Sequence, residues 1–173
     1  MKFKTKYIVP TVFLLVFFSI FLVACTDNDI ELNDGDTHLS EELNNTISNY
    51  IVQQYSTSSL NTEKQFEVHK VYGTSEKNDV TTVYFWSYYG GFNKSTGAEN
   101  QSGHSLPAVM QLKKESDHYT VVKYTEPEDG DFYQSSIKKM FPKKYLKRVY
   151  NDSGNSKDLE KEMDVLVKQW LAE

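Results

Sequence analysis

The feature that most constrains the fold is a run of β-branched and aromatic residues at 80–92 that contains no charged residue. This composition predicts a β-strand. Successive side chains alternate between the faces of a strand, so Tyr84, Trp86 and Tyr88 share one face while Phe85 and Tyr89 share the other. Large apolar groups on both faces favour a central strand covered on both sides. A second interpretation remains open: tyrosine and tryptophan suit half-wet surfaces, so the first three are candidate binding residues in a pocket or at an interface.

Three further strands are expected around this run, at 65–74, 105–113 and 118–125. Each segment is rich in β-branched or aromatic residues and is bounded by polar turn residues. Short connections between consecutive strands favour neighbours in space, which predicts a four-stranded antiparallel meander.

Apolar residues recur at helical spacing before the first expected strand. The period begins at Leu39 and predicts a helix that ends near Tyr55. Either Ser40 or Thr37 is suited to cap its first turn, because a hydroxyl oxygen accepts a hydrogen bond from an otherwise unpaired amide.

The helical period returns after a polar stop at 126–131. A short helix is expected around Ile137, a second begins at Pro142, and a last one is capped by Ser156. The order predicts an α+β fold with an N-terminal helix, a four-stranded antiparallel meander and two or three C-terminal helices packed on the sheet.

The first 24 residues are expected to direct export rather than to fold with the rest. Three lysines precede an apolar run of 17 residues, Ile8–Ala24, which is typical of a secretory signal. An uncleaved membrane anchor is the alternative, since the run is near the lower limit for crossing a bilayer. The tetrapeptide Leu22–Cys25 that ends the run is similar to the lipobox of bacterial lipoproteins.

That resemblance implies that Cys25 is the lipid attachment site, acylated with groups such as palmitate, and becomes the mature N-terminus. The protein would then be a lipoprotein on the extracytoplasmic face of the cell membrane. Acyl chains contribute about 0.8 kcal/mol per buried methylene, so a multiply acylated cysteine holds firmly to the bilayer. Cys25 is also the only cysteine, so an intrachain disulfide is impossible.

The expected domain organisation follows from these boundaries. Residues 1–24 are the signal peptide, 25–37 an acidic tether and 38–173 a single α+β domain. The tether has five acids and no basic residue. A calcium loop is the alternative for this segment, but the acids lack the regular ligand spacing of such loops.

The charge of the exported part argues against nucleic acid as a partner. Removal of residues 1–24 takes away three lysines and no acid, so the net charge falls from −5 to −8. Nucleic-acid-binding domains carry basic patches and recognition motifs instead.

The sequence predicts no catalytic residue, no metal site and no cofactor, and so a protein that is not an enzyme. Zinc ligands need characteristic spacings, which the four histidines lack: His38, His69, His104 and His118. Two matches to S-x-x-K, at 135–138 and 136–139, resemble the nucleophile motif of penicillin-recognising enzymes. The supporting Lys-Thr-Gly is absent and the chain is short for that fold, so we interpret both as chance matches.

Six cations without an acid occupy 138–148, the basic run: Lys138, Lys139, Lys143, Lys144, Lys147 and Arg148. The simpler interpretation is a solvated helix face. The alternative is a patch that meets anionic lipid or an acidic envelope protein, because each cation near an anionic surface contributes about 1 kcal/mol. The first four lysines are therefore candidate binding residues.

Several stretches together resemble an extracytoplasmic domain of Firmicutes, the Gram-positive bacteria in which it occurs on lipoproteins and at the C-terminal end of antirepressor-type membrane metallopeptidases. The similar stretches, which fall within residues 66–142, are 88–92, 105–109, 119–122, 126–130, Tyr133, 136–138 and 141–142. The peptidase part is missing, so no catalytic residue carries over. The resemblance implies a small sensory or binding module.

Three functions remain open at this point. The first is a membrane-anchored, non-enzymatic binding or sensory module of the cell envelope. The second is a small-molecule binder or enzyme on a cystatin-like or nuclear-transport-factor-like cone, which a buried acid or histidine in an aromatic cavity would favour. The third is an inhibitor or immunity lipoprotein that acts through the loop 93–103.

Overall fold

The computed structural model describes residues 31–36, 39–57, 61–116 and 118–173. The predicted signal peptide, Cys25, Thr37 and His38 lie outside these residues. Within them, an antiparallel sheet has the strand order β1-β2-β3-β4-β5. The strands are β1 (Leu32–Asp34), β2 (Lys64–Lys77), β3 (Val80–Phe92), β4 (Ser102–Glu115) and β5 (His118–Thr125). The helices are α1 (Glu41–Tyr55), α2 (Tyr133–Met140), α3 (Lys143–Asp152) and α4 (Lys157–Leu171).

The predicted α+β class and antiparallel meander are confirmed, but the predicted count of four strands is wrong. The described residues form a sheet of five strands. The additional strand is β1, which lies in the segment predicted to be a solvated tether and pairs with β2 from Leu32 opposite Ser75 to Asp34 opposite Gly73. A strand of three residues with one apolar side chain has no periodicity that a sequence pattern could reveal.

Contacts of α3 explain why β1 docks there. Asp34 accepts a hydrogen bond from the Tyr145 hydroxyl at 3.1 Å, and its other oxygen lies 2.8 Å from the Lys144 amino group. At Gly73, beside a bulge in β2, a Cβ atom would lie 2.1 Å from the Tyr145 hydroxyl and 2.4 Å from the Asn33 carbonyl oxygen. Only glycine allows β1 and α3 to approach β2 this closely.

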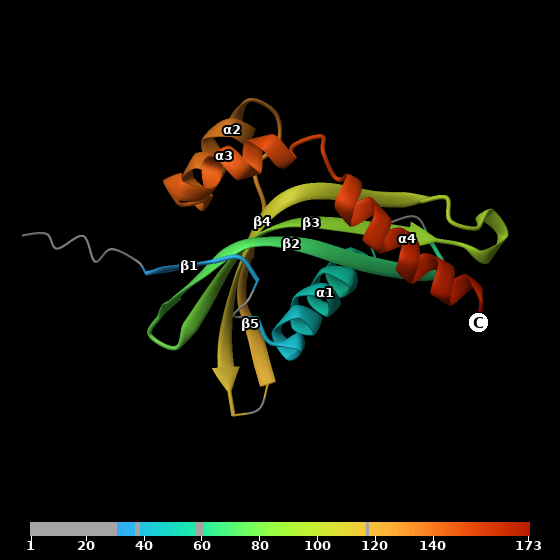
Figure 1. Cartoon of the computed structure of the whole chain (residues 1–173), viewed down its shortest axis with the longest axis horizontal. Helices are drawn as coiled ribbons and strands as arrows, with labels where there is room; N and C mark the ends of the chain where they lie inside the picture. The colour runs from blue at the N-terminus through green and yellow to red at the C-terminus, as the bar shows by residue number, and fades with distance from the viewer. Residues whose placement is uncertain (1–30, 37–38, 58–60, 117) are drawn as a thin grey trace, which may run out of the picture.

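Helices cover both faces of the sheet (Figure 1), α1 on one and α2, α3 and α4 on the other. The alternation in β3 determines this arrangement, because its large side chains enter both cores. Phe85 and Tyr89 are buried against α1, whereas Tyr84 and Trp86 are buried on the face of α3 and α4. The prediction of a central strand covered on both sides is confirmed.

The helix termini agree with the sequence in part. Ser40 caps α1, since its hydroxyl oxygen accepts a hydrogen bond from the Leu43 amide at 3.2 Å. Pro142 stands immediately before α3, as expected. Ser156 occupies the N-cap position of α4, but its hydroxyl donates to the Glu160 carboxylate at 2.7 Å and accepts no backbone amide. None of the helices in the described ranges is both long and apolar enough to cross a bilayer.

Candidate functional site

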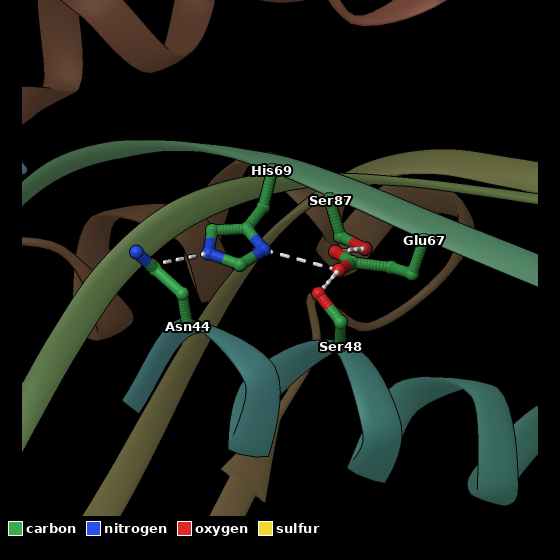
Figure 2. Close-up of polar contacts among 5 residues, drawn as sticks. All are labelled: Asn44, Ser48, Glu67, His69 and Ser87. Carbon is green, nitrogen blue, oxygen red and sulfur yellow. Dashed lines mark hydrogen bonds and ion pairs between the residues drawn. The ribbon is translucent and has the colours of Figure 1, made fainter. Parts of the chain in front are cut away.

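A cluster of polar side chains lies between α1 and the sheet (Figure 2). The Glu67 carboxylate of β2 accepts hydrogen bonds at 2.7 Å from the hydroxyls of Ser48 on α1 and Ser87 on β3. His69 Nδ1 lies 3.0 Å from the same carboxylate, and His69 Nε2 lies 3.1 Å from the Asn44 amide oxygen on α1. The cluster therefore joins α1 to two neighbouring strands through one carboxylate.

Neither ionisable group of this cluster is open to a substrate. The Glu67 side chain is 0% exposed and the His69 side chain is 8% exposed. Both Glu67 oxygens and both His69 nitrogens already contact protein groups. A buried charge of this kind is tolerated because its hydrogen bonds are satisfied. The arrangement accounts for structural cohesion and leaves no free group for chemistry.

A second set of polar groups closes the same face near the end of α1. The hydroxyls of Tyr55 and Tyr124 both donate to the Glu126 carboxylate, the latter at 2.6 Å. The ring of His104 packs against the rings of both Tyr55 and Tyr89, with centroids 4.3 Å and 5.3 Å away. Burial raises the pKa of both Tyr55 and Tyr124 and lowers the pKa of His104. The carboxylate is again held by protein donors.

The opposite face of the sheet carries an open groove beside α2. Its floor follows from strand register: Ser75 lies opposite Thr82, Thr82 opposite Gln111, and Gln111 opposite Lys123. Directly opposed residues point to the same side of a sheet, so these four side chains form one row across four strands. α2 contributes Lys139 and Met140 to the wall. Residues from five separate segments thus meet in one place.

Lysine is the only ionisable residue type with a charge at neutral pH in the lining of this groove. Lys77, Lys123 and Lys139 line a volume of about 540 Å³, which is in the usual range for ligand sites. None of the three forms an ion pair with an acid in the described residues. Met140 and Val122, which is 56% exposed, add apolar surface. We call the groove that these residues line, together with its floor of Ser75, Thr82 and Gln111, the cationic groove.

The structure divides the predicted basic run among several environments. Lys139 lines the groove, but Lys144 pairs with Asp34. Arg148 donates to the Tyr72 carbonyl at 3.2 Å and lies over the Tyr72 ring. The remaining cations of the run are exposed and outside the groove lining: Lys138, Lys143 and Lys147.

The three aromatic candidates are also separated. Tyr84 is 6% exposed and contributes to the groove, whereas Trp86 is 3% exposed and donates to the Ser105 hydroxyl at 2.8 Å. Tyr88 is half-buried and packs against the core on the side of α4. Of the three, only Tyr84 reaches the groove. The other predicted binding residue, Cys25, lies outside the described residues.

Two of the three groove lysines were not predicted from the sequence. Lys77 ends β2 and Lys123 lies on β5, so more than forty positions separate them. Only the register of the sheet brings them together with Lys139 of α2. A bulge in β5 at Val122 turns Lys123 to the face opposite that of Tyr119 and Val121, which simple alternation along the strand does not predict.

No family model, curated protein or solved structure matches this chain. Among the described residues, no group of three or more histidine, cysteine, aspartate or glutamate side chains is arranged to hold a metal ion. The function is therefore inferred from the geometry of the chain's own residues. The described residues provide an enclosed polar cluster around Glu67 and an open cationic groove.

Proposed function

We propose that this protein is a non-enzymatic binding module of the cell envelope, attached to the extracytoplasmic face of the membrane through lipid on Cys25. In this proposal the cationic groove binds an anionic envelope component. The resemblance of residues 66–142 to an extracytoplasmic domain of Firmicutes, which implies a sensory or binding module, supports the same class of function.

The binding proposal rests on one observation: the groove is positively charged, whereas the molecule as a whole has a negative net charge. Three lysines that form no ion pair with any acid of the described residues line one concavity on a chain whose net charge is −5, or −8 from residue 25 onward. Such a local reversal of sign attracts and orients anions. On the α1 face, the buried Glu67 and the half-buried Glu126 are engaged by protein donors, which favours binding over catalysis.

The anchor proposal rests on the lipobox-like tetrapeptide and is tested separately. Cys25→Ala is expected to abolish incorporation of labelled palmitate and to release the protein from the membrane or leave it as an unprocessed precursor. Fractionation of cells that express the parent or the variant measures this. A variant that matures and stays on the membrane like the parent contradicts the lipoprotein assignment.

Binding by the groove is tested with polyphosphate and poly-glutamate as anionic probes of the detergent-solubilised full chain. A variant with Lys77→Gln, Lys123→Gln and Lys139→Gln is expected to bind about 100-fold more weakly, because each cation near an anionic surface contributes about 1 kcal/mol. Its melting temperature should match that of the parent, because all three side chains are exposed.

The matched control removes the same charge from the same region. Lys138→Gln, Lys143→Gln and Lys147→Gln alter cations of the basic run that lie outside the groove lining. This control is expected to retain most of the binding. Equal loss in both triple variants would assign the effect to net charge, and no loss in either would refute the groove as the site.

A further inference from the structure

We infer that the groove faces the bilayer and that its ligand is the anionic headgroup of phospholipids in the membrane that holds the chain. This inference rests on the proposed function and names its partner. It follows from where the chain enters the sheet, which end of the molecule carries the groove, and the chemistry of the groove rim.

The connection between the proposed lipid anchor and the sheet is short. Only the six residues 26–31 separate Cys25 from the start of β1. Seven extended residue steps span at most about 25 Å. The tether predicted at 25–37 is therefore about half as long as the sequence suggested, because Leu32–Asp34 belong to the sheet.

This connection ends beside the cationic groove. Leu32 pairs with Ser75, and Ser75 itself lines the groove. The chain thus enters the sheet beside the groove floor. The contacts of Asp34 with Lys144 and Tyr145 fix β1 at that position. The lipid is consequently tied to the groove end of the domain.

The sheet extends far from the groove end toward the loop 93–101. β3 runs for 13 residues from the β2–β3 turn to the loop 93–101. At about 3.3 Å per residue this strand spans about 40 Å. The turn and the loop lie at opposite ends of the sheet (Figure 1), with the C-terminus near the loop. When the groove end meets the membrane, the loop points away from it.

The groove is chemically complementary to an anionic phospholipid headgroup. The overall negative charge repels an anionic bilayer, so the surface that approaches it must reverse the sign locally, as Lys77, Lys123 and Lys139 do. A phospholipid headgroup presents a phosphate above the start of its acyl chains. Lysine binds phosphate as a point charge, while Val122 and Met140 offer apolar contact to the layer beneath.

The test places one fluorophore at each end of the full-length lipidated protein. Because acylation blocks Cys25, the only native cysteine, Val122→Cys at the groove rim or Ser95→Cys in the loop introduces a unique thiol. Each labelled protein is reconstituted into vesicles of phosphatidylcholine alone or mixed with phosphatidylglycerol. Lipids with a headgroup spin label then quench any fluorophore near the surface.

The expected result is several-fold stronger quenching at position 122 than at 95 in vesicles with phosphatidylglycerol. The difference should shrink in phosphatidylcholine alone and at high salt, because exposed charges are screened beyond roughly 8 Å at physiological ionic strength. In the Val122→Cys background, Lys77→Gln, Lys123→Gln and Lys139→Gln should remove the dependence on phosphatidylglycerol. The matched Lys138, Lys143 and Lys147 triple should retain it.

Two outcomes overturn the inference and are separable from failure of the proposed function. Equal quenching at both ends with phosphatidylglycerol, or quenching at 122 that ignores the groove lysines, refutes the lipid headgroup as ligand. Polyanion binding by the groove would then still support an envelope partner of another kind. Labelling of the parent, which has no added cysteine, would show a free Cys25 and refute the anchor itself.

Discussion

The polar residues under α1 and those of the cationic groove, on the other face of the sheet, have opposite roles. On the α1 face, Glu67 and Glu126 are each enclosed by donors from separate elements. On the other face, the lysines of the groove point toward solvent without an acidic partner in the described residues. The same strands carry both sets, separated by the alternation of their side chains.

Coverage explains this difference. The 15 residues of α1 lie along one face, so most polar groups beneath it are paired within the protein. The buried His104 Nε2, which has no hydrogen-bond partner among the described residues, is an exception. On the other face, α4 packs against β2 and β3, and α2 leaves the groove at the sheet end open. Polar residues therefore stabilise the fold where a helix encloses them and remain available to a ligand where none does. Substitutions on the first face should change stability, and those in the groove should change binding.

Glu67→Ala breaks the closed face and should have the largest effect on stability. It leaves the hydroxyls of Ser48 and Ser87 and the ring of His69 without their shared acceptor, inside the core. Loss of one partner from a buried charged network costs about 3–5 kcal/mol. The melting temperature should fall by about 10 °C, measured by circular dichroism, since 1 kcal/mol shifts it by about 2–4 °C in domains of roughly this size.

An exposed acid gives the control for this experiment. Glu162→Ala on α4 also removes one carboxylate, and its melting temperature should stay near that of the parent. Residual polyanion binding by folded Glu67→Ala at low temperature should equal that of the parent, because the groove lies on the other face. Unchanged stability of Glu67→Ala would mean that the cluster does not hold α1 to the sheet.

His104 should give the closed face a dependence on pH of intermediate size. Burial against the rings of Tyr55 and Tyr89 lowers its folded pKa below the ordinary value of 6.5, although Glu126 and Glu67 oppose the shift. Below pH 6.5 the unfolded chain binds a proton that the folded chain does not, so stability falls with acidification until the folded pKa is reached. Denaturant melts at pH 7.5 and 5 should show this loss.

His104→Gln should reduce the loss of stability between these two pH values, whatever its effect on absolute stability. His118→Gln is the matched control, since the His118 side chain is 64% exposed on β5. It should leave the dependence on pH close to that of the parent. If both variants behave alike, His104 is not the source of the effect.

Local patterns were sufficient to predict most of the elements. The expected strands at 80–92 and 118–125 coincide with β3 and β5, because each is rich in β-branched and aromatic residues and is bounded by clear turn residues. The start of α1 was open between two caps, and the structure assigns Ser40. These features depend on neighbours within a few residues, which the sequence displays directly.

The groove and β1 depend on partners that are distant in sequence. Lys123 acquires its role from its register with Gln111, and β1 exists because Gly73 lets Tyr145 approach Asp34. The basic run was visible as a cluster of charge, yet Lys144 is engaged by an acid of the expected tether. Long-range pairing, rather than composition, decides which cations remain available.

Asp34→Asn should produce the smallest effect, confined to the edge strand that orients the groove. The hydrogen bond from Lys144 is the main reason that the pKa of Asp34 lies below its ordinary value of 3.8. The contact is therefore complete above pH 3.8 and is lost as the pH falls through the lower folded pKa. Asp34 is exposed, so salt should weaken the contact and the global melting temperature should change little.

The measurement is amide hydrogen exchange of residues 31–36, expressed as protection at pH 6 and again below pH 3. In the parent, protection should decrease on acidification, notably at the Gly35 amide, which donates to the Tyr72 carbonyl at 3.0 Å. Asp34→Asn should show the reduced protection already at pH 6, with little further change. Because release of β1 lengthens the connection to Cys25, the same variant should also reduce the difference in quenching between positions 122 and 95. Unchanged protection in the variant would assign the docking of β1 to its backbone pairing with β2 alone.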